Sequence, residues 1–129
     1  MADNGRGLRI RRGAFADVYL NRAAAPGYTT VIWNGPHVAE PTQLDEGQAA
    51  GFFGEMLLAA RAVETYFKPV KMNYEVLGNA VPHLHVHLIP RFVDDPAPGV
   101  PLPTSLLRPV RRTDHRFRAD VEGLRRLLV

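Results

Sequence analysis

The chain has 129 residues, of which 46% are hydrophobic, and it carries a formal net charge of +3 with no cysteine. This length fits a single domain, 1–129, with one packed core. The lack of cysteine excludes a disulfide framework, and no apolar run approaches the roughly 20 residues that span a bilayer. Because the N-terminus also has no apolar leader, we expect a cytoplasmic protein with no membrane partner.

The positive charge gathers at the two ends of the chain. Arginines are frequent in residues 1–12 and 108–129, whereas residues 13–107 hold more acidic than basic side chains. Non-specific binding of nucleic acid needs basic groups together on one face. The distribution favours an ordinary solvated surface, so nucleic acid is not an expected partner.

The first expected elements are two short strands. Phe15–Asn21 alternates between the two faces of a strand, and Thr29–Trp33 is a run of β-branched and aromatic residues. Pro26 and Gly27 mark a turn between them. We therefore expect these strands to pair in an antiparallel manner.

One long helix follows. Asp45 is a suitable N-cap, Gln48 completes a capping box, and Lys68 precedes the proline that ends the helix. An apolar stripe with a period of 3.6 residues runs along it: Ala49, Phe52, Phe53, Met56, Leu57, Ala60, Val63 and Phe67. The stripe predicts a helix packed on one face of a sheet.

A hairpin and a terminal helix complete the expected fold. Residues 70–77 and 83–89 are predicted to be its two strands, and the proline-rich residues 93–112 to be an extended loop. Residues 113–129 are predicted to be a helix with one apolar face: Phe117, Val121, Leu124 and Leu128. The fold class is α+β, an antiparallel sheet of about five strands with a main helix and a C-terminal helix, and its core spans about 13–92.

The strand at residues 83–89 is the main candidate for function. His83, His85 and His87 occupy alternate positions, and side chains two residues apart on a strand share one face at about 6.5–7 Å intervals. The opposite face is apolar: Leu84, Val86 and Leu88. We expect the apolar face to join the core and the imidazoles to face a cleft.

Several roles fit such a row of imidazoles. It could be a polar surface, or a zinc site in which a His-x-His pair supplies two ligands and a third comes from elsewhere. It could instead perform covalent catalysis at phosphorus, because neutral imidazole is nucleophilic and a neighbouring imidazolium can donate a proton. Repulsion between like charges would keep His85 neutral, which makes the middle position the natural nucleophile. A non-catalytic nucleotide-binding module is a further alternative.

The segment HLHVHLI at 83–89 matches the His-φ-His-φ-His-φ-φ signature of the histidine triad family, in which φ is apolar. The following Pro90-Arg91 resembles its fragile-histidine-triad branch, which hydrolyses diadenosine polyphosphates, and a looser likeness covers about residues 15–91. The resemblance implies nucleotidyl transfer to water or another acceptor, with no cofactor. It also implies a nucleotide as the small-molecule substrate and a homodimer whose sheets continue across the interface.

The resemblance further implies a role for each site residue. His85 would attack the α-phosphorus and form a nucleotidyl-histidine, His87 would contact the phosphate and assist the leaving group, and His83 would orient His85. Asn73 resembles the family's phosphate-side Asn or Gln, and Asn21 its ribose-contacting residue, although either side chain could instead form hydrogen bonds at the end of a strand. The expected substrates are dinucleoside polyphosphates, nucleoside phosphoramidates and related phosphoanhydrides.

Other positions supplement or depart from the family pattern. Asn79 and backbone N–H groups near the Gly78 turn are candidate phosphate donors, since glycine lets backbone approach an anion closely. Ala80 replaces the Ser or Thr of many members, and Tyr28 stands where Pro-Gly-His is common. His37 resembles a histidine that some members keep after the second strand, and it is either a partner of the site or a plain surface residue.

Overall fold

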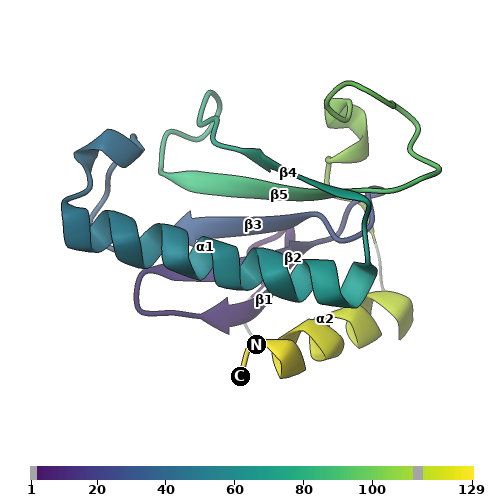
Figure 1. The fold of residues 1–129 in the computed structure, drawn as a ribbon, viewed down its shortest axis with the longest axis horizontal. Coiled ribbons are helices and arrows are strands. Elements are labelled where there is room, and N and C mark those ends of the chain that lie inside the picture. The colour runs from purple at the N-terminus through teal and green to yellow at the C-terminus, as the bar shows by residue number, and fades with distance from the viewer. Residues whose placement is uncertain (1–2, 112–114) are drawn as a thin grey trace.

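The computed structural model describes residues 3–111 and 115–129. Within them, a 5-stranded antiparallel sheet has the order β1-β2-β3-β5-β4. The elements are β1 (Gly7–Arg12), β2 (Ala16–Asn21), β3 (Thr29–Trp33), α1 (Glu46–Phe67), β4 (Lys71–Glu75), β5 (His85–Arg91) and α2 (His115–Leu127). Helix α1 lies across one face of the sheet, and α2 lies near β1 (Figure 1). The predicted α+β fold is confirmed.

Local sequence signals account for the bounds of the main elements. Strand β3 coincides with its prediction, and it pairs with β2 in an antiparallel manner as expected. At the start of α1 the Asp45 carboxylate accepts the backbone N–H of Gln48, and the Gln48 side chain accepts the N–H of Asp45. Lys68 ends the helix in the left-handed region, with φ of 54°. The capping box therefore fixes the first turn, and the residue before Pro69 fixes the last.

The structure also differs from the sequence prediction. Strand β1 is absent from the prediction and lies before the expected core at 13–92. Strand β5 runs through Pro90 to Arg91, so Pro90 does not end it; pairing with β3 stops earlier, at Leu88. Helix α2 is described from His115, and residues 113 and 114 of the predicted helix lie outside the described residues.

The core lies between the sheet and the two helices. Its α1 side is formed by Phe52, Ala59, Ala60, Ala62 and Val63, and its β5 side by Leu84, Val86 and Leu88. Three small alanines let the helix approach the strands closely. Leu57, which the apolar stripe predicted to be buried, is 42% exposed, because the buried face of α1 is rotated toward the alanines. Helix α2 adds the predicted set: Phe117, Val121, Leu124 and Leu128.

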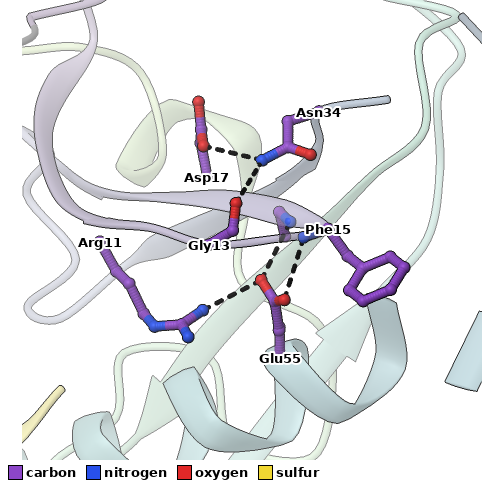
Figure 2. Close-up of polar contacts among 7 residues, drawn as sticks. Arg11, Gly13, Phe15, Asp17, Asn34 and Glu55 are labelled. Carbon is purple, nitrogen blue, oxygen red and sulfur yellow. Dashed lines mark hydrogen bonds and ion pairs between the residues drawn. The ribbon is translucent and has the colours of Figure 1, made fainter. Parts of the chain in front are cut away.

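A buried carboxylate joins α1 to the β1–β2 turn. Glu55, whose side chain is 12% exposed, accepts the backbone N–H groups of Phe15 and Ala16, each at 3.0 Å, and pairs with the Arg11 guanidinium at 3.0 Å (Figure 2). Three donors on one carboxylate compensate its loss of water. The contact fixes the sheet edge on the helix.

The proline-rich segment packs on the other face of the sheet, where the histidines lie. Leu102, Leu106 and Leu107 contact a second cluster that includes Tyr28 and Ile89. A backbone hydrogen bond from Ala25 N–H to the Leu106 carbonyl, at 3.1 Å, holds the segment in place. This segment is therefore a packed wall and not a free spacer. Among the described residues no helix is both long and apolar enough to cross a membrane.

Candidate active site

Strand β5 presents its histidines on the face opposite α1. Val86 and Leu88 are fully buried against the core, whereas His85 and His87, which alternate with them, are only partly covered. His83 precedes the strand and continues the same alternation. Across the sheet His87 pairs with Thr30 and His85 with Ile32 of β3, so the imidazoles lie over the middle of the sheet.

The histidines open into a cavity of about 220 Å³. Its walls come from β3 and the end of β2, from the residues before β1, and from Leu107 and Pro109 of the proline-rich segment. Two arginines, Arg6 and Arg22, line it, and no carboxylate does among the residues that the structure describes; the Arg22 guanidinium is paired with the Asp3 carboxylate. The cavity is therefore suited to an anionic ligand with an apolar part.

The proton on His85 can be assigned from its hydrogen bond. Its Nδ1 lies 2.6 Å from the His83 carbonyl oxygen. A carbonyl only accepts, so Nδ1 carries the hydrogen, and in the neutral ring Nε2 keeps its lone pair. Nε2 has no hydrogen-bond partner among the described residues. The free nitrogen of the middle histidine is thus a nucleophile within the cavity.

His83 is held by both of its ring nitrogens. Nε2 lies 2.6 Å from the Trp33 carbonyl oxygen, and Nδ1 lies 2.8 Å from Nδ1 of His37. The rings of His37 and His83 also stack, with centroids 5.1 Å apart. Since Nε2 must donate to the carbonyl, the neutral His83 ring accepts at Nδ1 from His37. Of the two roles that the sequence left open for His37, the structure shows the contact with the site.

His87 lies deeper and is held by Tyr28. The Tyr28 hydroxyl is 2.7 Å from His87 Nδ1, and the two rings stack with centroids 5.8 Å apart. Burial, followed by the charges of His85 and Arg6, lowers the pKa of His87 from 6.5 to about 4. At neutral pH His87 is therefore uncharged, and any proton that it offers comes from a neutral ring.

The structure brings only some of the predicted site residues together. The cavity is lined by His83, His85, His87 and Asn21. Asn73 lies outside it, where its side-chain oxygen accepts from the Arg91 guanidinium at 2.7 Å. Arg91 also forms a nearly buried ion pair with Asp95, and their hydrogen bond lowers the pKa of the Asp95 carboxyl.

Of the β4–β5 loop, only Val81 and His83 line the cavity among the described residues. Asn79 is exposed, and Gly78 adopts a φ of 86°, a left-handed conformation that favours glycine. Their predicted contacts to phosphate remain predictions. Val81 is 52% exposed and forms an apolar lip beside the histidines.

Several cavity residues were missed by sequence reasoning. Arg6 and Asn4 precede β1, a strand whose signal was the alternation of Leu8 and Ile10 with arginines. Thr30 was visible as part of β3, but its place opposite His87 depends on the register of β3 against β5. Leu107 belongs to a proline-rich segment with no periodic pattern, so no local signal indicated its place.

The geometry does not provide the metal site that the sequence left open. Across residues 3–111 and 115–129 no group of three or more His, Asp or Glu side chains is arranged to hold a metal ion. Both ring nitrogens of His83 are within hydrogen-bonding distance of Trp33 and His37. A His-x-His pair of His83 and His85 would have to break these bonds to bind zinc.

Comparison with known proteins identifies the class. The sequence profile of the HIT domain matches residues 14–94, and the chain belongs to the HIT domain family. Members of this family are generally nucleotidyl hydrolases or transferases, although some are non-catalytic. A search of curated proteins gives no significant match.

Solved structures agree with the family. A histidine triad protein from Bradyrhizobium japonicum is 27% identical over 97% of this chain and 92% of its own, with a TM-score of 0.87. One from Marinobacter aquaeolei is 25% identical over 96% and 90%, with a TM-score of 0.86. A zinc-bound family protein from Mycobacterium smegmatis, 22% identical over 95% and 84% with a TM-score of 0.67, shares the fold.

Proposed function

We propose that this protein is a nucleotidyl hydrolase or transferase that cleaves a nucleoside phosphate ester or anhydride at the α-phosphorus through a nucleotidyl-histidine on His85. One observation carries the proposal. His85 donates its Nδ1 hydrogen to the His83 carbonyl, which leaves the Nε2 lone pair free in a cavity with two arginines and, among the described residues, no carboxylate. A nitrogen lone pair beside guanidinium groups suits attack on an anionic phosphate.

The reaction needs two displacements. In the first, His85 Nε2 forms a bond to phosphorus while the bond to the leaving group breaks, and the leaving group keeps the electron pair. In the second, the oxygen of water or of another acceptor bonds to phosphorus while the P–Nε2 bond breaks; Nε2 keeps the electron pair, so the ring is neutral again, and the acceptor releases its proton to solvent. Because each step inverts phosphorus, the overall reaction should retain its configuration.

The assignment to the fragile-histidine-triad branch is part of the proposal and follows from the motif Pro90-Arg91. Arg91 is 8% exposed and bonded to Asp95 and Asn73. The motif can therefore be explained by folding alone. The triad and the cavity suit both a dinucleoside polyphosphate and a nucleoside phosphoramidate as substrate.

Intact-mass measurement after brief incubation with diadenosine triphosphate tests the proposal. We expect a mass increase of one adenylyl group that is acid-labile, maps to His85, and is absent in His85→Ala. Inversion of configuration at phosphorus would instead show direct attack by water. Binding without an adduct or product would indicate a non-catalytic nucleotide-binding module, and activity lost with a stoichiometric zinc ion on chelation would indicate a metal site.

We also propose a homodimer formed through β4. The sheet has two edges, and at the β1 edge the Arg125 guanidinium donates to the Arg9 carbonyl oxygen, at 2.5 Å from its Nη2 atom. The β4 edge and the loop after it expose large apolar residues: Tyr74, Val76 and Leu77. Sedimentation equilibrium should give twice the chain mass, and Tyr74→Lys should lower it; a wild-type monomer at micromolar concentration would disprove the dimer.

A further inference from the structure

Two neighbouring histidines of β5 are held with their protons on opposite nitrogens. His85 has its hydrogen on Nδ1, because that atom faces the His83 carbonyl oxygen. The Nδ1 atom of His87 faces a hydroxyl, which can either donate or accept. The proton on His87 therefore depends on which way the Tyr28 hydroxyl points.

The surroundings of that hydroxyl fix its direction. Tyr28 is 6% exposed, and among the described residues His87 Nδ1, at 2.7 Å, is the atom that its hydroxyl hydrogen-bonds. A buried phenol hydrogen without an acceptor is costly, whereas the lone pair of an unprotonated Nδ1 can accept it. Tyr28 therefore donates to His87 Nδ1, and the hydrogen of the neutral His87 ring is consequently on Nε2.

Packing stabilises this arrangement. The aromatic ring of Tyr28 stacks on His87 and packs in the cluster of Ile89 beneath the proline-rich segment. Asn21, which the family resemblance assigned to ribose, also lines the cavity, and its side-chain amide donates to the Thr30 hydroxyl at 2.7 Å.

We propose that Tyr28 is a positioning residue that keeps His87 as a neutral Nε2–H donor, so that the protein favours phosphoanhydride substrates over phosphoramidates. The proposal rests on the proposed nucleotidyl transfer and deepens it by naming the class of leaving group. Tyr28 acts through His87 and does not itself contact the reacting atoms.

The preference follows from where the proton must go. When a phosphoanhydride P–O bond breaks, the leaving phosphate departs as an anion and needs only a hydrogen bond from His87 Nε2. When a phosphoramidate P–N bond breaks, the leaving nitrogen must take a proton. A neutral His87 could supply it only if the Tyr28 proton moved to Nδ1, which would leave a phenolate. Burial raises the pKa of Tyr28 and opposes that step.

The tautomer can be measured without any substrate. We expect ¹⁵N NMR of the ring nitrogens at pH 7 to show His87 protonated at Nε2 and unprotonated at Nδ1, and His85 with the reverse pattern. In Tyr28→Phe the His87 ring should lose the single tautomer, which would appear as averaged nitrogen shifts. A wild-type His87 with its hydrogen on Nδ1, or an unchanged spectrum in Tyr28→Phe, would overturn the proposal.

Kinetics test the selectivity. The wild-type ratio of kcat/KM for diadenosine triphosphate over adenosine 5′-phosphoramidate should exceed one and fall about tenfold in Tyr28→Phe, the effect of one hydrogen bond. Tyr66→Phe is the matched control, since it removes a hydroxyl bonded to Asp120 far from the cavity and should keep the wild-type ratio. An unchanged ratio in Tyr28→Phe would overturn the proposed selectivity.

The two proposals fail in distinguishable ways. If the wild-type protein formed no adduct with either substrate, nucleotidyl transfer would be wrong and the proposed selectivity with it, whereas the NMR tautomer would still decide the role of Tyr28. If adducts formed equally fast in Tyr28→Phe and wild type with both substrates, nucleotidyl transfer would stand and the role of Tyr28 would be wrong.

Discussion

His37 and His83 lie with their Nδ1 atoms 2.8 Å apart and their rings stacked, although 46 positions separate them in the sequence. The contact extends a chain of hydrogen bonds from the exposed His37 through the His83 ring to the Trp33 carbonyl. His83 in turn supplies the carbonyl that binds His85. The orientation of the proposed nucleophile therefore depends on a residue at the surface.

Replacing His37 should weaken catalysis indirectly. His37→Phe keeps a ring that can stack but removes the donor to His83, so we expect kcat to fall about tenfold with little change in KM. Steady-state kinetics measure this split, and His37→Gln, which retains a donor, should recover part of the rate. A loss above about a thousandfold would show that His37 takes part in the chemistry directly.

Replacing His85 should abolish turnover while the fold survives. His85→Gly removes the nucleophile from the cavity face and leaves the core residues Val86 and Leu88 in place. We expect kcat to fall by more than about a thousandfold, with unchanged far-UV circular dichroism. His115→Ala, an exposed histidine at the start of α2, is the control and should keep full activity. More than about a tenth of the wild-type kcat in His85→Gly would contradict the assignment.

The pKa of His87 predicts how stability depends on pH. That pKa is lowered from 6.5 in the unfolded chain to about 4 in the fold, so between these pH values the unfolded state binds more protons. The free energy of unfolding should decrease as the pH falls through this window, and the His87 contribution should be constant outside it. Between pH 7 and 4.5 the free energy of unfolding, measured by urea denaturation, should fall by about 1 kcal/mol less in His87→Gln than in the wild type. The difference is limited to this size because His87 is partly exposed and solvent screens its charge. Equal decreases in both proteins would refute the assignment.

Replacing Glu55 should destabilise the fold without touching the cavity. Glu55→Gln keeps the side-chain shape but places an amide against the backbone donors of Phe15 and Ala16, and we expect a loss of about 1–3 kcal/mol in urea denaturation. Glu122→Gln removes an exposed ion pair with Arg125 and should cost less than about 0.5 kcal/mol. Similar losses of stability in the two variants would show that the Glu55 carboxylate contributes no more than an exposed ion pair.

Gly123 should resist a substitution that helix propensity favours. A Cβ there would lie 2.2 Å from the Tyr66 ring, so Gly123→Ala should destabilise by about 1–3 kcal/mol. Gly54→Ala is the control, because it is exposed in α1 with nothing within 4 Å, and it should stabilise by about 0.5–1 kcal/mol. Thermal unfolding of both proteins measures the difference, and stabilisation by both would contradict the predicted clash.

Residues with strong local signals allowed most of the fold to be predicted. Three local patterns each predict one element without reference to distant contacts: the capping box of Asp45 and Gln48, the alternation at His83–Ile89, and the β-branched run of β3. Strand β1 carried the weaker alternation of Leu8 and Ile10 among arginines, and a bulge between Arg9 and Arg11 interrupts its register. Strand β1 was not predicted because arginines alternate with its apolar residues, and only the inner face of such a strand needs to be apolar.

The parts of the candidate site that depend on one strand alone were predictable, and the parts that depend on the register between strands were not. The histidines share one face by the geometry of any strand. Asn73 was expected near phosphate, but its side chain is bound to Arg91, and this contact arises only once β4 and β5 are aligned. The hydrogen bond between Tyr28 and His87 likewise requires β3 and β5 to pair with Thr30 opposite His87.

The packed proline-rich segment affects how this protein can be dissected. A fragment trimmed to the profile match at 14–94 would retain every histidine of the triad yet lose β1, Leu107 and α2. It would expose Tyr28 and Ile89 to solvent on one face and the α1 core on the other. The family profile thus covers less of the chain than the unit that folds, and the C-terminal segment that contains Leu107 is needed to form the ligand chamber.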